Sequence, residues 1–549
     1  MKSRSIIFFF LAGLMVFGCT EKQEYRPPNV ILFFSDELDP GYVSAYDGPI
    51  PTPNIDKLAS EGIRFDRAFV TAPMCTPSRF SLLTGLYPGR CDHPQFLDAY
   101  PREDPYTIAW NTYLTETIVT IPKVLSKHGY FTGMVGKWHI GRLPDDIEIP
   151  VFRDDDDLDD PVIDEKLKSL QNIHIDRVRQ EGGFDYAKSV LWGNFDGFAL
   201  KELRFHNFPW ITKGALDFLD AASIKDQPFF LYSATTAVHG PGHVNAFQRD
   251  INYTLEGKMR DLDSYNLNPD SMMQVLSGIE GRMRHKYAGM ACVDHHVKLV
   301  IQKLESLGLD DNTMVIFMAD HNIEPGKTTC YEKGLKVPLI VRWPDRIQPN
   351  TISQVMVQSL DLFPTILKLA GIGSQDLKLD GKSIDRVLTG DGTAVHNYIY
   401  SESGLIRSVS DGKYKYISFR YPKSRTEQIE KGEIEYAPNY MNMERQAHSS
   451  IAMAKYPSYF DADQLFDLEN DPYEQHNLAY DPEHQEILNK MQEVLLKYLS
   501  GFNHAYHFGD TAIMRSEKYS ELAAKSRAIG TSYIPWLQRD HGSIIWPPE

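Results

Sequence analysis

Short apolar runs that alternate with helical segments constrain the fold of this 549-residue chain more than any other feature. The runs are rich in branched and aromatic residues, as is typical of strands buried on both faces of a mostly parallel sheet. They are NVILFFS (29–35), FTGMVG (131–136), FFLYSA (229–234), MVIFMA (314–319) and PLIVRW (338–343). Segments with helical spacing, each with a glycine near its end, lie between them at 55–63, 121–129 and 284–308. The alternation predicts an α/β fold with helices on both faces of a mostly parallel or mixed sheet.

The pattern changes after about residue 395. Short strand-like pieces follow, such as NYIYSES (397–403) and DGKYKYISF (411–419), and a helical segment lies near 483–499. We therefore predict a large α/β domain over 29–395, and a smaller α+β domain with an antiparallel sheet, together with a tail, over 396–549. The length fits two units, because a single core rarely grows beyond about 250 to 300 residues.

The charge of the chain restricts its partners. A formal net charge of −17 argues against a nucleic-acid binder, because such proteins carry a dense basic surface. An anionic ligand must therefore meet a local cluster of cations. The acidic run FRDDDDLDD (152–160) is interpreted as a solvated loop, because it lacks the glycine and the terminal glutamate of an EF-hand calcium loop.

The N-terminus has the pattern of an export signal. Lys2 and Arg4 precede the apolar run IIFFFLAGLMVFG, which suits a secretory signal but is short for a membrane span. The run ends at VFGC (16–19), which resembles a bacterial lipobox, so we predict a lipoprotein signal peptide over 1–18, lipidation of Cys19 and a linker over 19–28. An ordinary signal peptide cleaved nearby is the alternative. The lipoprotein interpretation predicts an exported protein, anchored through its lipid to a membrane, in the periplasm or outer membrane of a Gram-negative bacterium.

Polar residues follow four of the predicted strands directly. Because ligands of open parallel sheets bind outside the carboxyl ends of the strands, we expect these side chains to meet in one site. Oxygen donors predominate among them, and such a set favours a hard divalent cation, calcium above all. Each acid taken singly could also be a helix cap, but two convergent groups favour a metal. The residues are Asp36 and Glu37, Lys137 and His139, His239, and Asp320, His321 and Asn322.

The stretch MCTPSRFSLLTG (74–85) predicts a short helix that begins near Cys75, with Pro77 in its first turn and Gly85 at its end. Cys75 could be a buried hydrophobe, a thiolate nucleophile or the precursor of another group. The helix N-terminus favours an anion, and Arg79 adds a cation one turn later. Lys327 follows the Asp320 loop closely enough to reach the same crevice. These cations, with the two imidazoles after the strands, suit a tetrahedral oxyanion ester.

The same residues resemble a known family. Cys75-Thr76-Pro77-Ser78-Arg79, continued by Leu82, Thr84 and Gly85, is similar to the CxPSRxxLxTG signature of type I sulfatases, of the alkaline-phosphatase superfamily. Their cysteine is oxidised to Cα-formylglycine after translation. The likeness extends over nearly all of the mature chain, through PNVILFFSDE, GYFTGMVGKWHIG, PFFLYSATTAVH, DNTMVIFMADHN, KVPLIVRWPDRI and LFDLENDPYEQHNLA.

The resemblance implies a role for each site residue. Cys75 would become formylglycine and Arg79 would orient it. Lys137 and Lys327 would bind sulfate oxygens, and His139 and His239 would be the acid/base pair. One Ca²⁺ would be held by Asp36, Glu37, Asp320 and His321. Two positions depart from the common pattern, because the family most often has Asp at the place of Glu37, and many members have Asn at the place of His321.

The implied reaction is hydrolysis of a sulfate ester. The aldehyde would hydrate to a gem-diol, and one hydroxyl would attack sulfur while His239 protonates the leaving oxygen. His139 would then take the proton of the second hydroxyl, so that sulfate is expelled. The implied partners are a sulfated glycan (glycosaminoglycan, mucin or algal polysaccharide) and a maturation enzyme, either formylglycine-generating or anaerobic sulfatase-maturating.

Two other functions remain open from the sequence. One is a phosphonate or phosphate monoester hydrolase of the same superfamily; the other is an inactive glycan-binding lipoprotein, which only Glu37 favours. Substrate contacts are expected in the loops 91–117 and 189–210. Candidate sugar contacts there, each of which could equally be structural, are Asp98, Trp192, His206 and Trp210. Disulfides among Cys91, Cys292 and Cys330 cannot be assigned from their spacing.

Overall fold

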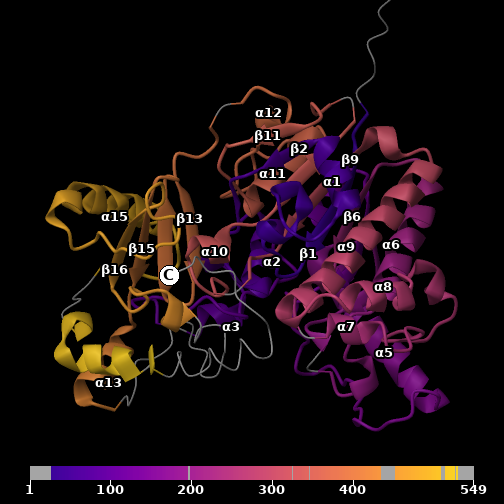
Figure 1. The fold of residues 1–549 in the computed structure, drawn as a ribbon, viewed down its shortest axis with the longest axis horizontal. Helices are drawn as coiled ribbons and strands as arrows, with labels where there is room; N and C mark the ends of the chain where they lie inside the picture. Colours follow the sequence, from indigo (N-terminus) through magenta and orange to yellow (C-terminus); the bar gives the residue numbers. More distant parts are fainter. Residues whose placement is uncertain are drawn as a thin grey trace, which may run out of the picture.

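A computed structural model of the protein shows a large α/β domain beside a smaller antiparallel sheet (Figure 1). It describes residues 26–528, except for 100, 196–197, 241, 324, 345, 393, 434–451, 509–512 and 526. The predicted signal peptide, the lipidation site Cys19 and the tail beyond residue 528 lie outside the described residues. Among the residues that are described, no helix has the length and apolar character needed to span a membrane.

The central sheet has eight strands in the order β11-β2-β10-β9-β1-β6-β4-β5. All five predicted strands are present, as β1 (Asn29–Ser35), β4 (Phe131–Lys137), β6 (Phe229–Ala234), β9 (Thr313–Ala319) and β10 (Leu339–Arg342). The sheet is mixed, because β10 runs antiparallel to both of its neighbours while the other pairs are parallel.

Three strands of this sheet were not predicted. They are β2 (Ile63–Phe65), β5 (Tyr186–Leu191) and β11 (Thr351–Ser353). Two of them have only three residues, which is too short for an apolar alternation to be distinguished from a loop. Their pairing comes from neighbours that are distant in the sequence.

Helices cover both faces of the sheet, as predicted (Figure 1). Successive strand residues point to opposite faces, so Phe33 of β1 packs edge-on against His296 while the ring of Phe34 lies under Arg79. His296 belongs to the layer with α1 (Pro53–Ser60), α6 (Phe208–Ser223), α8 (Pro269–Leu276) and α9 (Gly281–Ser306). Arg79 belongs to the layer with α2 (Cys75–Thr84), α4 (Ile121–Lys127) and α11 (Leu362–Leu369).

Peripheral elements complete the large domain. The acidic run at 152–160 is a mostly exposed loop, as expected. The Asp160 side chain caps α5 (Pro161–Arg177) by accepting a hydrogen bond from the Val162 N–H. The remaining elements of this domain are α3 (Pro94–Leu97), α7 (His243–Ala246), α10 (Glu332–Leu335), α12 (Asp385–Leu388), β3 (Ala68–Phe69), β7 (Tyr253–Thr254), β8 (Gly257–Lys258) and β12 (Val357–Gln358).

The smaller domain is the predicted antiparallel sheet. Its strands are β13 (Ile399–Ser403), β14 (Ile406–Ser410), β15 (Tyr414–Phe419) and β16 (Asp463–Asp467), and they pair in chain order. Helix α15 (Gln485–Leu499) packs on this sheet, and α13 (Lys423–Lys431) follows β15. Buried hydrogen bonds tie the sheet to the large domain, because the Glu402 carboxylate accepts from the hydroxyl of Tyr106 at 2.7 Å and from the N–H of Gly89 at 2.6 Å.

Candidate active site

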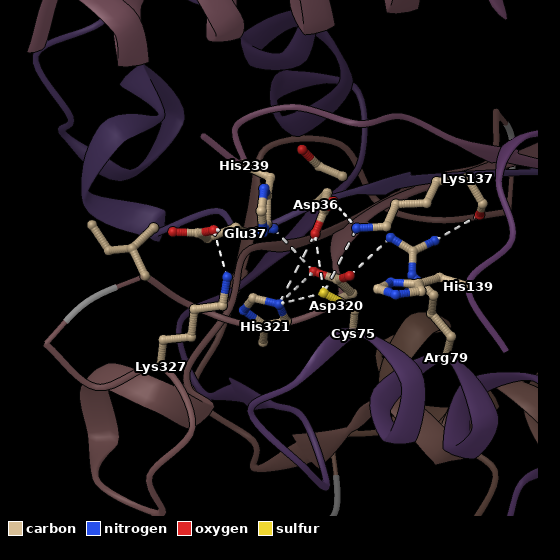
Figure 2. Close-up of polar contacts among 12 residues, drawn as sticks. Asp36, Glu37, Cys75, Arg79, Lys137, His139, His239, Asp320, His321 and Lys327 are labelled. Atoms are coloured by element: carbon tan, nitrogen blue, oxygen red, sulfur yellow. Dashed lines mark hydrogen bonds and ion pairs between the residues drawn. The ribbon is translucent and has the colours of Figure 1, made fainter. Parts of the chain in front are cut away.

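The predicted site residues meet at one edge of the central sheet (Figure 2). Strands β9, β1, β6 and β4 are neighbours, and the three pairs that they form are parallel, so their carboxyl ends lie side by side. The N-terminus of α2 faces this edge. The side chains drawn together there are Asp36, Glu37, Cys75, Arg79, Lys137, His139, His239, Asp320, His321 and Lys327.

Cys75 is the first residue of α2 and is buried. Its Sγ lies 3.2 Å from Nε2 of His321 and 3.6 Å from Oδ1 of Asp36. Burial raises the pKa of the Cys75 thiol to about 12. The positive charge of Lys137 lowers this pKa by less than burial raises it, and the carboxylates of Asp36 and Asp320 raise it further. In these surroundings the thiol stays protonated, which is unlike the low-pKa thiolate expected of a cysteine nucleophile.

Arg79 fixes α2 to the sheet. Its guanidinium is fully buried and donates from Nη2 to Oδ2 of Asp320 at 2.8 Å. From Nη1 it donates to the carbonyl of Lys137 at 3.0 Å and to the hydroxyl of Tyr232 at 3.2 Å. One side chain thereby joins the helix of Cys75 to the ends of β9, β4 and β6. A planar guanidinium with several fixed donors can make these contacts together, whereas a lysine cannot.

Two carboxylates and an imidazole form a group with Cys75 that could hold a metal ion. The donor atoms of Asp36, Asp320, His321 and Cys75 all lie within 4.8 Å of one another. Nδ1 of His321 lies 2.7 Å from the carbonyl of Asn322, and since a carbonyl only accepts, Nδ1 carries the proton and Nε2 presents its lone pair to the group. Burial opposes the ionisation of Asp36, but the nearby positive charges, that of Lys137 first, hold its pKa well below the usual value. This donor set fits a hard divalent cation.

Glu37 points elsewhere. Its backbone is left-handed, with φ of 60°, and its N–H donates to Oδ1 of Asp320 at 2.9 Å. The carboxylate accepts from Lys327 at 2.8 Å and lies 3.6 Å from Nε2 of His239 and 3.8 Å from Nζ of Lys286. Among the described residues it is not part of the group around Cys75. Its expected role as a metal ligand therefore stays a prediction.

Lys137 and His139 leave the end of β4 on one side of the site. Lys137 donates to Oδ2 of Asp36 at 2.5 Å and to Oδ1 of Asn194 at 2.6 Å. The backbone of His139 is left-handed, with φ of 58°, and is held by a hydrogen bond from its N–H to the carbonyl of Trp192 at 2.9 Å. Burial, together with the charge of Lys137, holds the pKa of His139 well below its usual value. The imidazole is therefore neutral at neutral pH.

His239 stands on the opposite side, at the mouth of the site. Its side chain is 17% exposed, and Nδ1 donates to the carbonyl of Gly240 at 2.6 Å. Burial and the charge of Lys327 lower the pKa of His239 to about 3, although Asp36 and Glu37 oppose this shift. An anion bound between the two histidines would raise both pKa values, because an opposite charge stabilises an imidazolium.

Each carboxylate at the site is paired with a basic side chain before any ligand is added. Three carboxylates, those of Asp36, Glu37 and Asp320, are paired directly with Lys137, Lys327 and Arg79. A divalent cation would make this buried site positive. A positive site of this kind attracts an oxyanion, even on a protein whose net charge is −17.

Two contacts at the site come from residues that the sequence reasoning did not select. Lys286 approaches Glu37 from α9, and Asn194 approaches Lys137 from the loop after β5. Asn194 lies inside the 189–210 loop that is expected to bind substrate, and that role of the loop stays a prediction. Nothing in the sequence indicated that Lys286 lies at the site, because a single lysine within a helical pattern is most often solvent-exposed.

The four candidate sugar contacts differ in accessibility. His206 and Trp210 are buried, and His206 stacks on His243 with 3.8 Å between ring centroids. Trp192 is partly buried and stacks on His174, and Asp98 is exposed at the end of α3. His206 and Trp210 therefore have the environment of structural residues.

In the described part of the chain, Cys91, Cys292 and Cys330 are buried and form no disulfide.

Comparison with known proteins agrees with this geometry. A family described as sulfatase matches residues 28–372, and one described as N-sulphoglucosamine sulphohydrolase, C-terminal, matches residues 326–447. Arylsulfatase A of Homo sapiens is 28% identical over 550 residues, with 94% of each chain covered. N-acetylgalactosamine-6-O-sulfatase of Bacteroides thetaiotaomicron is 26% identical over 587 residues, with 90% of this chain and 99% of the relative covered.

A solved structure shares the fold. It was determined in work on the metabolism of multiple glycosaminoglycans by Bacteroides thetaiotaomicron. It superposes with a TM-score of 0.59 at 22% sequence identity, and the match covers 86% of this chain and 99% of that chain.

Proposed function

Because the chain belongs to the sulfatase family, we propose that it removes sulfate from an O-sulfated carbohydrate, using formylglycine made from Cys75 and a calcium ion. The family match covers more than half of the chain, so the protein is a sulfuric ester hydrolase. The observation that carries the finer proposal is the buried group of Asp36, Asp320 and His321 around Cys75. The similarity to N-acetylgalactosamine-6-O-sulfatase of Bacteroides thetaiotaomicron supports a carbohydrate substrate.

The proposed cofactors fit the donors present. Asp36, Asp320 and His321 would hold the calcium ion, and the first residue of α2 would carry the aldehyde. When present, formylglycine supplies a hydroxyl nucleophile through its hydrate, and calcium adds positive charge beside the sulfate oxygens. A serine or thiol could attack sulfur but could not expel sulfate by reforming an aldehyde.

The cations of the chain bind and orient the sulfate group. Lys137 lies 3.7 Å from Sγ of Cys75, so its ammonium is close to the position from which a nucleophile would act. Lys327 reaches the site from the other side, where it contacts Glu37. Together they neutralise charge that spreads over the sulfate oxygens during transfer, in a buried site where such contacts are strong.

The two histidines move protons. His239 lies at the mouth of the site, where a leaving sugar oxygen can meet its imidazole, and we assign it the protonation of that oxygen. His139 lies on the Cys75 side, since its carbonyl accepts a hydrogen bond from the Thr76 hydroxyl at 2.8 Å, and we assign it the removal of the nucleophile's remaining proton. Both imidazoles gain protons more readily once the anionic substrate is bound.

Export as a lipoprotein is also proposed, on the N-terminal sequence alone. Lys2, Arg4, the apolar run and the VFGC stretch support it. An exported enzyme would meet glycosaminoglycans, mucins or algal polysaccharides outside the cell. Labelling with radioactive palmitate, compared between the natural chain and Cys19→Ala, tests the lipid anchor.

Sulfate release from defined sulfated monosaccharides and oligosaccharides tests the proposed function. We expect release from at least one O-sulfated sugar, and turnover of an aryl sulfate well above that of the matched aryl phosphate. A clear preference for the phosphate ester would favour the phosphate or phosphonate hydrolase instead. Protein that holds formylglycine and calcium but releases sulfate from neither the sugars nor the aryl ester would support a binding role.

A further inference from the structure

Glu37 is enclosed by basic groups from three separate segments. Lys327 comes from the loop after β9, His239 from the loop after β6, and Lys286 from the second turn of α9. The Glu37 side chain is 4% exposed, so water does not screen these contacts. Lys327 and Lys286 place basic groups beside this carboxylate, and the ring of His239 lies next to it.

Lys286 connects this carboxylate to the His239 loop. It is 5% exposed, and its ammonium donates to the carbonyl of Val238, the residue before His239, at 2.7 Å. The same Nζ lies 3.8 Å from Oε1 of Glu37. Lys286 therefore contacts both the residue that holds Lys327 and the backbone that carries His239.

The length of the glutamate side chain explains its direction. The Glu37 N–H is tied to Asp320, so the backbone stays at the metal group while the side chain extends away from it to Lys327. An aspartate, which has one methylene fewer, would keep its carboxylate closer to the backbone. The longer glutamate side chain comes within 3.8 Å of a buried lysine of helix α9, Lys286.

We propose that Glu37 and Lys286 form a positioning pair that holds Lys327 and His239 in place for the sulfate group, and that Glu37 does this in place of metal coordination. The inference rests on the proposed function, since it assigns the pair to the same sulfate site. Glu37 acts through Lys327, and Lys286 acts through Glu37 and the Val238 carbonyl. Neither is assigned a direct contact with the reacting atoms.

Calcium affinity and sulfate affinity separate this role from a ligand role. Both are measured by titration calorimetry on the full-length protein, for the natural chain, Glu37→Gln, Lys286→Met and the double variant. Asp36→Asn is the positive control for loss of a metal ligand. Lys298→Met is the matched control, because Lys298 is an exposed lysine of the same helix α9.

We expect Glu37→Gln to keep calcium affinity within about threefold, whereas a lost ligand or its outer-shell partner costs about 10- to 100-fold. Both single variants should weaken inorganic sulfate binding by about tenfold, which corresponds to about 1.4 kcal/mol. The loss in the double variant should be smaller than the sum of the two single losses, because Lys286 acts in part through Glu37. With an aryl sulfate, KM should rise more than kcat falls.

Three results would overturn the inference. They are a loss of calcium affinity in Glu37→Gln as large as that in Asp36→Asn, additive losses of sulfate affinity in the double variant, or unchanged sulfate affinity in both single variants. Any of these in a protein that hydrolyses sulfate esters leaves the proposed function intact. A natural chain that neither binds sulfate nor hydrolyses its esters would overturn both.

Discussion

Arg79 and Asp320 form an ion pair of 2.8 Å in which both side chains are completely buried. The pair joins the helix that begins with Cys75 to the strand end that carries a predicted metal ligand. This contact therefore helps to fix the position of Cys75 relative to Asp320. This explains why an arginine lies one turn after the cysteine in the sequence.

Removing this arginine should affect both stability and activity. Arg79→Ala leaves Asp320 buried without its partner, and we expect a loss of about 3 to 5 kcal/mol in the free energy of unfolding. Urea unfolding followed by fluorescence measures it. Arg142→Ala is the control, because Arg142 pairs with Asp145 at the surface, and such pairs contribute about 0 to 1 kcal/mol. Equal losses in the two variants would contradict the assignment.

Arg79→Lys separates charge from geometry. Lysine keeps the positive charge but cannot reach Asp320, the Lys137 carbonyl and the Tyr232 hydroxyl together. We expect a smaller loss of stability than with alanine, but a large loss of kcat. Retention of most of the activity in Arg79→Lys would show that charge alone is needed.

Conversion of Cys75 is the second prediction. Mass spectrometry of the peptide that contains residue 75 should show formylglycine in active protein and cysteine in protein made without a maturation enzyme. Cys75→Ala should have no sulfatase turnover and an unfolding free energy within about 1 kcal/mol of the natural chain, because a small buried side chain is removed. Full turnover by protein whose Cys75 remains a thiol would contradict the proposed nucleophile.

The third prediction concerns pH and His296. Its ring lies between the hydroxyl groups of Thr212 at 2.9 Å and Ser233 at 2.8 Å, and burial, with a smaller contribution from His295, lowers its pKa to about 3. A pKa that is lower in the folded state means that stability is complete above the unfolded value, about 6.5, and is lost as pH falls toward 3.

This loss can be measured directly. We expect the free energy of unfolding to fall on acidification between pH 6.5 and 3, with up to about 1.4 kcal/mol per pH unit due to His296. His296→Gln should reduce the slope by up to about 1.4 kcal/mol per pH unit. The same change at His476, whose side chain is 84% exposed, is the control. Equal slopes in the natural chain and His296→Gln would contradict the assignment.

The fourth prediction tests the loop that carries Lys327. A Cβ on Gly326 would lie 2.1 Å from the carbonyl carbon of Lys333 and 2.2 Å from the nitrogen of Gly334. Both are backbone atoms, so a side-chain rotation cannot relieve the clash. We expect Gly326→Ala to displace Lys327 and to raise KM for an aryl sulfate, while Gly278→Ala, at an open position, changes neither KM nor kcat. Unchanged kinetics in Gly326→Ala would show that the loop adapts.

Much of the fold was determined by local sequence. Buried strands such as NVILFFS and FFLYSA are recognisable from their own residues, because a strand covered on both faces must be apolar throughout. The strand ends and the Cys75 helix could also be placed from the local sequence, because helix caps, glycines and turns depend on only a few neighbouring residues. The signature around Cys75 then indicated the family.

Other features were decided only by tertiary contacts. The short strands β2 and β11 exist because distant strands pair with them, and His206 and Trp210 are buried by packing that no local pattern records. The direction of Glu37 and the partnership of Lys286 belong to the same class. A long side chain can turn toward any partner within reach, and which partners lie within reach depends on segments that are far apart in the chain. The sequence by itself therefore determined the five apolar strands and the polar residues at their ends, and the tertiary structure decided the remaining strand pairs and which charges face one another.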